Sequence, residues 1–262
     1  MVLKLALAAL FASLGSNAWA QPAAKPPTAD QILKKYIDAS GGDEAFKRVN
    51  TVVMRGTMEI KAQGVKAEMI LYRADGGKSY SMMDIAGMGK QEEGSNGDIV
   101  WEKTAMGPRL KDGVEKFIVT CAGEAMAEYA RVAVGKDGCY SKIELGGEDT
   151  VAGKPVWKLL LTPKQGKVEE QYFDKESGLM VQQKLIMPTP LGEIPILLGI
   201  GGYKTLEGLQ TPTLVSMRMG PVEMTMNFHS ITFNEKIPEQ IFAIPPDIAA
   251  LVKAQKPVTA KP

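Results

Sequence analysis

The feature that most constrains the fold is a two-residue alternation of apolar and polar side chains in several separate segments. Successive side chains of a strand point to opposite faces, so each such segment predicts a strand with one buried and one wetter face, as in antiparallel sheets. The apolar members of three segments are Val52, Met54, Met58 and Ile60; Val65, Ala67, Met69 and Leu71; and Val222, Met224, Met226 and Phe228. Further strands are predicted at 78–85, 98–103, 139–146, 155–162, 167–174, 178–187 and 211–219, which gives about ten or eleven strands in all.

Helical periodicity interrupts this alternation in two regions. Thr28 begins a Thr-x-x-Gln capping pattern, and apolar residues then recur at helical spacing until Gly41. A second short helix is predicted at 43–49. A longer helix is predicted from 112 to about 134, and Gly123 inside it predicts a break into two pieces.

The first 20 residues have the organisation of a secretory signal peptide. Lys4 precedes an apolar run at 5–14, and a small-x-small cleavage site ends at Ala20. The apolar run is too short to span a bilayer, which needs roughly 20 residues. We therefore expect cleavage after Ala20, a Pro/Ala spacer at 21–27, a mature chain without a transmembrane segment, and a location in the periplasm.

No Pro/Ser-rich linker divides the remaining chain. We predict one mainly β (α+β) domain at 28–248, followed by a flexible tail at 249–262.

Export also bears on the two cysteines, Cys121 and Cys139, because a single pair in an oxidising compartment favours a disulfide. Closing a loop of this size stabilises a fold by about 3 kcal/mol. The alternative is a metal site with His229, but two cysteines and one histidine leave a closed tetrahedral site one ligand short. We favour the disulfide and expect no metal or other cofactor.

The charge balance and the residue inventory argue against several classes of function. Without Lys4, the chain's 31 basic residues fall to 30 and match its 30 acidic residues, so the electrostatic footprint of a nucleic-acid-binding protein is missing. A single histidine and the lack of a G-x-S-x-G motif argue against a catalytic triad. The glycine-rich segment 146–155 lacks the spacing of a phosphate loop, and segment 199–202 leads into a predicted strand, so it offers no helix N-terminus to a pyrophosphate. We predict that the protein is not an enzyme. A hydrolase whose catalytic carboxylates come from distant strands is kept as an alternative.

The methionine residues and one apolar segment indicate that the protein binds a ligand or a partner. Methionine side chains are flexible and polarisable, so they suit surfaces that accept ligands of variable shape, although ordinary core filling accounts for them equally well. We predict a lipid-binding cavity lined by Met54, Met58, Met69, Leu71, Met217, Met219, Met224, Met226 and Phe228. Segment 191–202 is apolar and glycine-rich, and we expect either an exposed loop that forms a lid or binds a partner, or a loop tucked over the sheet. Its candidate residues are Leu191, Ile194, Ile196, Leu197 and Leu198.

Five stretches that run from about residue 30 to 246 occur in a recognisable order. They are ILKKYIDASGGDEAFKRVNTVVMRGTMEI, GSNGDIVWEKTAMGPRLKDG, YFDKESGLMVQQ, GGYKTLEGLQTPT and NEKIPEQIFAIP. In this order they resemble the LolA/LolB-like outer-membrane lipoprotein carrier superfamily, especially its lipoprotein-sorting proteins. The resemblance implies an incomplete, strongly curved antiparallel β half-barrel with helices covering its concave face. It also implies a hydrophobic cavity between sheet and helices that shields acyl chains.

On this resemblance, the helices at 30–49 and 112–134 would form the cover and the methionine-rich faces the wall. LolA-type carriers hold their lid helices with an arginine on an early strand, and Arg55 is the candidate here. The alternation nevertheless places Arg55 opposite Met54 and Met58, outside the site. Since no cysteine is available for lipidation near Ala20, a soluble carrier is favoured over a membrane-anchored acceptor.

We therefore predict a soluble periplasmic carrier of lipid or lipoprotein acyl chains, which could exchange its cargo with a membrane-bound donor or acceptor protein. The alternative is a protein-interaction or sensor module of the same fold that binds a partner through 191–202.

Overall fold

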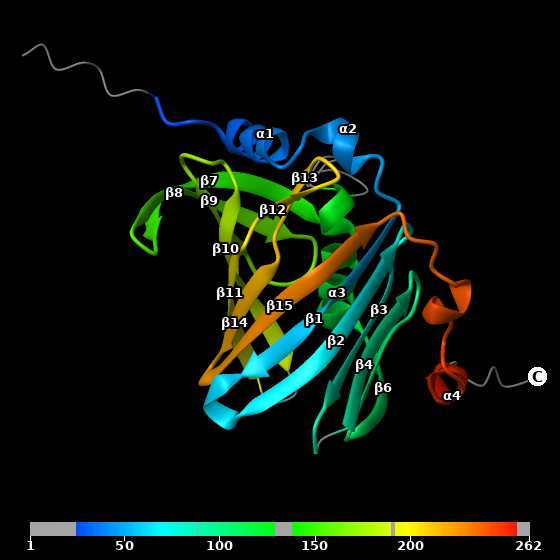
Figure 1. Ribbon diagram of the computed structural model, residues 1–262. Helices are drawn as coiled ribbons and strands as arrows, with labels where there is room; N and C mark the ends of the chain where they lie inside the picture. The colour runs from blue at the N-terminus through cyan, green and yellow to red at the C-terminus, as the bar shows by residue number, and fades with distance from the viewer. Residues whose placement is uncertain (1–24, 88, 129–137, 190–191, 256–262) are drawn as a thin grey trace, which may run out of the picture.

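Figure 1 shows the computed structural model of the chain, which describes residues 25–87, 89–128, 138–189 and 192–255. Several sequence predictions lie outside the described residues: the signal peptide at 1–20, the spacer up to residue 24, the long helix beyond residue 128, Leu191 and the end of the tail at 256–262.

One antiparallel sheet of 13 strands dominates the structure. Its strands in chain order are β1 (Thr51–Ile60), β2 (Val65–Ala74), β3 (Lys78–Ile85), β4 (Gly89–Asn96), β5 (Val100–Thr104), β6 (Gly107–Lys111), β7 (Tyr140–Val151), β8 (Lys154–Pro163), β9 (Glu169–Asp174), β10 (Met180–Thr189), β11 (Gly192–Gly201), β14 (Leu214–Met219) and β15 (Val222–Phe233). Across the sheet they lie in the order β6-β5-β4-β3-β2-β1-β15-β14-β11-β10-β9-β8-β7. Two short strands, β12 (Lys204–Leu206) and β13 (Leu209–Thr211), form a separate hairpin.

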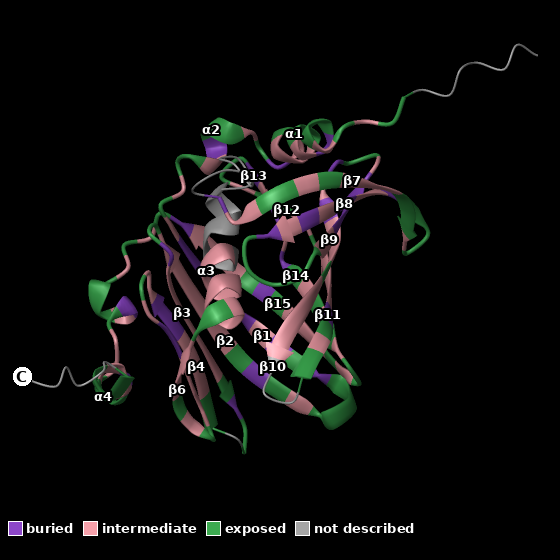
Figure 2. Ribbon diagram, turned by 180° about the vertical axis from the view of Figure 1, so that it is seen from behind, coloured by how far each residue is buried: buried purple, intermediate pink, exposed green. Residues whose placement is uncertain are grey.

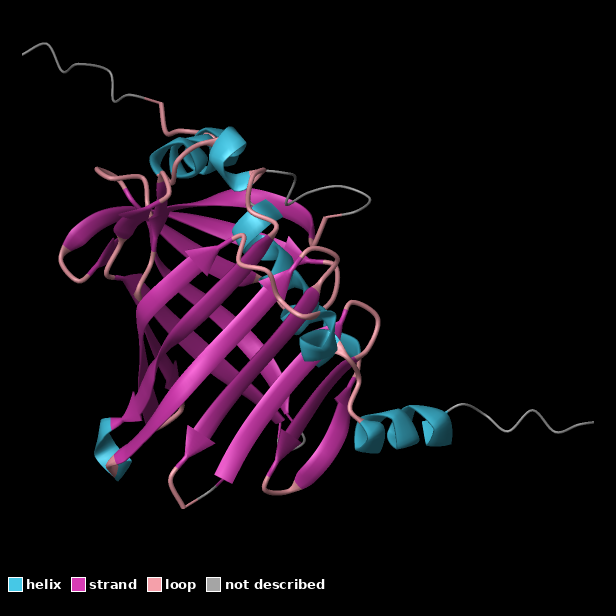
Figure 3. Cartoon of the chain, turned by 45° about the vertical axis from the view of Figure 1, so that its right-hand side comes forward, coloured by secondary structure: helices cyan, strands magenta, loops and turns pink. Residues whose placement is uncertain are grey.

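The sheet curves strongly without closing, so the predicted half-barrel is confirmed (Figure 3). Strands β1 and β15 pair at its centre, and β6 and β7 are its two open edges. The β1–β15 register shifts between Arg55 and Gly56, and a bulge of this kind increases the local bend and twist. Gly56 is required there, since a Cβ atom on it would lie 2.3 Å from the carbonyl oxygen of Asn227.

The helices are α1 (Ala29–Ala39), α2 (Asp43–Phe46), α3 (Gly113–Glu128) and α4 (Pro246–Gln255), with short 3-10 helices η1 (Lys61–Gln63) and η2 (Glu239–Phe242). The predicted capping box at the start of α1 is present, with the Thr28 side chain accepting a hydrogen bond from the Gln31 amide. Helix α3 runs without interruption through Gly123, so the predicted break there is wrong. Among the residues that the structure describes, no helix is both long and apolar enough to cross a bilayer.

Helix α3 lies over the concave face of the sheet, where it contacts β3, β5 and β10 (Figure 2). In the sequence it stands between the two edge strands, β6 and β7. Helices α1 and α2 lie across one end of the half-barrel, near β7 and α3 (Figure 1). The concave side is therefore covered by α3 along its length and by α1 and α2 at one end.

The convex face of the first half of the sheet is covered by the C-terminal segment. Helix α4 packs against β6, and η2 packs against β3 and β4. The side chain of Ile248 is completely buried, and Asp247 forms an ion pair of 2.9 Å with Lys103. The prediction of a flexible tail from residue 249 is therefore wrong as far as Gln255, because Ile248 anchors a helix that continues to that residue.

The described part of segment 191–202 is a strand and not a loop. Residues Gly192–Gly201 form β11, which is hydrogen-bonded to β10 and β14 on its two sides. Its glycines and Pro195 resemble loop composition, yet both neighbours pair with it in regular register. Together with the polar strands β4 and β6, it raises the main sheet to 13 strands from the ten or eleven expected.

Candidate functional site

A partly open cavity of about 390 Å³ lies between the concave face of the sheet and helices α1 to α3. This volume falls within the range of roughly 300–1,000 Å³ that is typical of small-molecule sites. Helix α3 contributes Phe117 and Ile118, while β11 and β14 contribute Leu198 and Met217 from the facing wall. These residues are apolar, so the cavity suits a hydrocarbon ligand better than a polar one.

The strand register places all nine residues of the predicted cavity on the concave face. Met217 lies opposite Leu198 on one side and Met224 on the other, and Phe228 lies opposite Gly56. The remaining predicted residues alternate onto this face in the same way: Met54, Met58, Met69, Leu71, Met219 and Met226.

Only Met217 of these nine borders the main cavity, and Leu71 borders a neighbouring pocket. Met54 and Phe228 are buried in one core cluster, and the partly buried Met69, Leu71 and Met226 pack against it. Met58 is buried in a second cluster, and its partly buried neighbours include Met69, Met224 and Met226. Most of the predicted methionines therefore fill the half-barrel, and the open space remains at the end that α1 and α2 cover.

The residues expected in the 191–202 loop are divided between the two faces of β11. Ile196 and Leu198 line the cavity, and Ile194 shares their face by alternation. Leu197 points to the opposite face and borders a shallow groove with Val168 and Ile186. The predicted lid residues therefore belong to the wall of the cavity and to the outer surface of the sheet.

Two sets of interactions fix α3 over the cavity. Cys121 of α3 is disulfide-bonded to Cys139, just before β7, which confirms the predicted pairing. At the start of the helix, Glu115 accepts hydrogen bonds of 2.7 and 3.0 Å from the guanidinium of Arg109 on β6. Helix α3 is thus attached to both open edges of the sheet.

One group of polar side chains at the cavity is centred on Glu169 of β9. Glu169 accepts hydrogen bonds from the Tyr140 hydroxyl at 3.0 Å and from the Gln183 amide at 2.9 Å, and all three side chains line the cavity. Burial raises the pKa of the Glu169 carboxyl above its ordinary value, and the two hydrogen bonds act in the opposite direction. A carboxyl group with a raised pKa is more easily kept neutral, which suits an apolar site.

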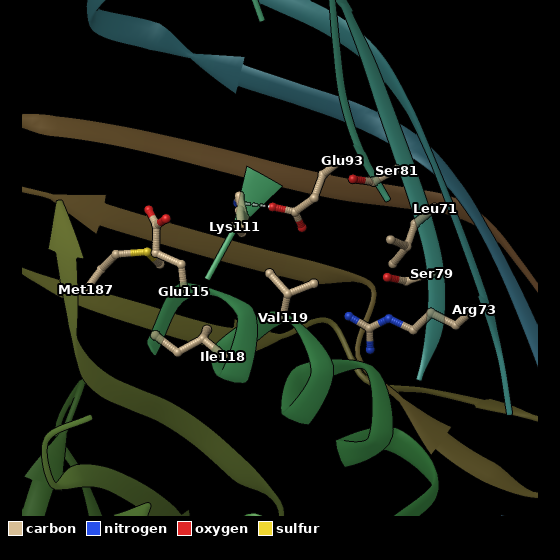
Figure 4. Close-up of a pocket in the computed structure, with 10 residues that line it drawn as sticks. All are labelled: Leu71, Arg73, Ser79, Ser81, Glu93, Lys111, Glu115, Ile118, Val119 and Met187. Carbon is tan, nitrogen blue, oxygen red and sulfur yellow. Dashed lines mark hydrogen bonds and ion pairs between the residues drawn. The ribbon is translucent and has the colours of Figure 1, made fainter. Parts of the chain in front are cut away.

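A second pocket of about 190 Å³ adjoins the first and is shown in Figure 4. Arg73 of β2 borders both pockets. In Figure 4 its guanidinium points away from the strand towards Val119 of α3. Burial lowers the pKa of this guanidinium, and the negative charge of Glu93 partly offsets the effect.

Sequence reasoning missed Arg73, although a pattern could have found it. The alternation along β2 continues from Leu71 to Arg73, which pairs with Val52 on the same face. Arg55, the candidate for an arginine that holds the lid helices, lies on the other face of the sheet, as the alternation predicts. There it forms an ion pair of 3.2 Å with Glu235. His229 is exposed.

No protein-family model and no curated protein sequence matches the chain. Among solved structures, a DUF1329 family protein from Desulfovibrio piger is similar, with a TM-score of 0.54 and 15% sequence identity over 82% of this chain and 96% of that chain. A LolA superfamily protein from Nitrosomonas europaea gives a TM-score of 0.53 and 12% identity over 84% and 99% of the two chains. A domain from Vibrio parahaemolyticus assigned to outer membrane lipoprotein sorting gives 0.51 and 13% over 81% and 94%.

Sequence identities this low bear on the fold alone. The similarity nevertheless extends over more than four fifths of this chain and almost the whole of each of the three structures. It agrees with the curved, unclosed sheet and its covering helices. The chain has the LolA-like fold.

Proposed function

We propose that the protein is a non-enzymatic, exported carrier that shields an acyl chain of a lipid or lipoprotein in the cavity beneath α3. The observation that carries this proposal is the cavity itself, whose lining is dominated by apolar side chains from the sheet and α3. The similarity to a LolA superfamily protein and to a lipoprotein-sorting domain supports it. The disulfide and the expected signal peptide support a periplasmic location.

The size of the cavity limits the cargo. If a methylene group occupies about the volume of a water molecule in the liquid, roughly 30 Å³, then a cavity of about 390 Å³ holds about 13 such groups. Each buried methylene contributes about 0.8 kcal/mol, so a single chain of this length gives a favourable term of about 10 kcal/mol before the losses on association are subtracted. The cavity therefore fits one acyl chain.

The proposal is tested by placing a new charge on either side of one strand. Met217→Glu puts a carboxylate into the cavity wall, whereas Ser216→Glu puts the same group on the exposed face one residue away. We expect the first variant to lose binding of a fluorescent fatty acid and the second to retain it. Thermal unfolding of both variants checks that they fold. Equal binding by a folded Met217→Glu protein would contradict the proposal.

A second candidate function, a partner-binding module, draws on the outer face of β10 and β11. Val168 is 50% exposed there and borders a groove with Ile186 and Leu197. The carrier proposal predicts that Leu197→Glu leaves fatty-acid binding unchanged. A partner-binding module predicts instead that this variant loses a protein partner that the Met217→Glu variant still binds.

A further inference from the structure

We propose that Arg73 is a recognition site for the anionic head group of the bound amphiphile, so that the preferred ligand is a single-chain acid and not a neutral lipid. This inference rests on the proposed function and adds the chemical class of the ligand. Arg73 stands where the two pockets meet, because it borders both the apolar cavity and the smaller, more polar pocket. A chain lying in the first pocket would therefore bring its head group to Arg73.

Among the residues that the structure describes, the guanidinium of Arg73 has no carboxylate partner. Its Nε atom is completely buried and makes no hydrogen bond, and no carboxylate of the described residues lies within ion-pair distance of the side chain. The side chain keeps partial accessibility because it borders the two pockets. A buried charge without a partner is strongly unfavourable. An anionic ligand group beside the guanidinium would remove that penalty.

The other charged groups around the smaller pocket already have partners. Lys111 pairs with Glu93 (Figure 4) and, at 3.1 Å, with Glu102. Glu115 accepts both of its hydrogen bonds from Arg109. Among the charged side chains that line this pocket, only Arg73 is therefore left to bind a ligand.

The surroundings of Arg73 also restrict the type of anion. Ser79 lies beside Arg73 in the strand register and Ser81 lies beside Leu71, so two hydroxyl groups line the same pocket and can donate to an anionic oxygen. The carboxylates of Glu93 and Glu115 border it too, and their negative charge opposes a second charge on the ligand. A monoanion such as a fatty-acid carboxylate fits this arrangement better than a phosphate dianion.

The test compares an acid and an alcohol of equal chain length. Tetradecanoic acid and tetradecanol would each displace the neutral dye Nile red from the mature protein at about pH 8, where a carboxyl group is ionised. We expect the wild-type protein to prefer the acid about tenfold or more, because hydrogen bonds to charged groups are the strong ones. Acetate carries the head group without the chain and should displace no dye.

The variant Arg73→Met removes the charge and keeps a side chain of similar length. We expect it to bind the acid and the alcohol equally, with the affinity for the alcohol unchanged. The matched control, Arg55→Met, removes an arginine from the opposite face of the adjacent strand and should keep the wild-type preference. Arg73→Met should also fold, since it eliminates an unpaired charge, and thermal unfolding checks this.

Three results would overturn the inference: no acid preference in the wild-type protein, a preserved preference in Arg73→Met, or an equal loss of both ligands in a folded Arg73→Met protein. The failure of the carrier proposal looks different, because the wild-type protein would then bind neither the acid nor the alcohol.

Discussion

Filling the cavity should shorten the acyl chain that the protein accepts. Leu198 is the position to change, because it lies in the middle of the wall on β11, between Gln183 and Met217 in the neighbouring strands. In Leu198→Trp the indole ring would occupy space that a ligand chain otherwise takes. Met217, the neighbour across the sheet, is flexible and lets the ring be accommodated with little disturbance of the sheet.

The expected loss of affinity follows from the volume of the cavity. A cavity of about 390 Å³ holds about 13 methylene-sized groups at roughly 30 Å³ each. If the indole ring displaces three of them, at about 0.8 kcal/mol each, the affinity for a chain that filled the wild-type cavity falls by about 2.4 kcal/mol. This is about a 50-fold increase in Kd.

The assay measures the Kd of saturated fatty acids of increasing length. For the wild-type protein, the binding free energy should improve by about 0.8 kcal/mol per methylene and then level off when the cavity is full. Leu198→Trp should keep the slope and level off about three methylenes earlier. Leu214→Trp, the same substitution at a position that is 40% exposed on the outer face, is the control and should follow the wild-type curve. A Leu198→Trp curve that coincides with the wild-type curve would refute the assignment of the cavity.

Three further predictions concern stability. Replacing Cys121 and Cys139 by serine should lower the free energy of unfolding by about 3 kcal/mol, because it opens a link across 18 residues; urea denaturation measures this, and an unchanged midpoint would contradict it. Glu169→Gln should remove a pH dependence of the free energy of unfolding. Because the pKa of Glu169 is raised, the native state holds the proton more tightly than the unfolded state. Wild-type stability therefore falls relative to the variant as the pH rises above the ordinary pKa of 4.5. Thermal unfolding of both proteins over this range tests the sign, and a constant difference between them would refute it. Gly56→Ala should destabilise the fold by about 1–3 kcal/mol, since the new methyl group would meet the Asn227 carbonyl oxygen; wild-type stability in this variant would show that β1 can move away.

The parts of the fold that the sequence predicts correctly are those in which local pattern and burial agree. The alternation at β1, β2 and β15 places the correct residues on the concave face, and strands form at 167–174 and 178–187 as β9 and β10. Strand β4 escapes prediction because its concave side carries Glu93 and Ser95, which face a polar region where apolar residues would mark an ordinary core. The same polar region contains Arg73.

The position of the cavity could not be predicted from the alternation. Met58 and Met217 have the same residue type and lie on the same face, yet Met58 is buried among Ile60, Ala67 and Ile85, whereas Met217 borders open space. What separates them is the placement of α1, α2 and α3 relative to strands distant in the sequence. Segment 191–202 illustrates the same limit, because its composition is typical of a loop and only its pairing with β10 and β14 makes it a strand.

Native mass spectrometry of the mature protein purified from the periplasm shows directly whether the cavity holds an acyl chain. Solvent extraction of the sample would then identify whatever is bound. We expect a mass increment from one single-chain amphiphile per protein, which the Met217→Glu variant loses and the Ser216→Glu variant keeps. A mass equal to that of the polypeptide alone, unchanged after incubation with fatty acids, would contradict this expectation.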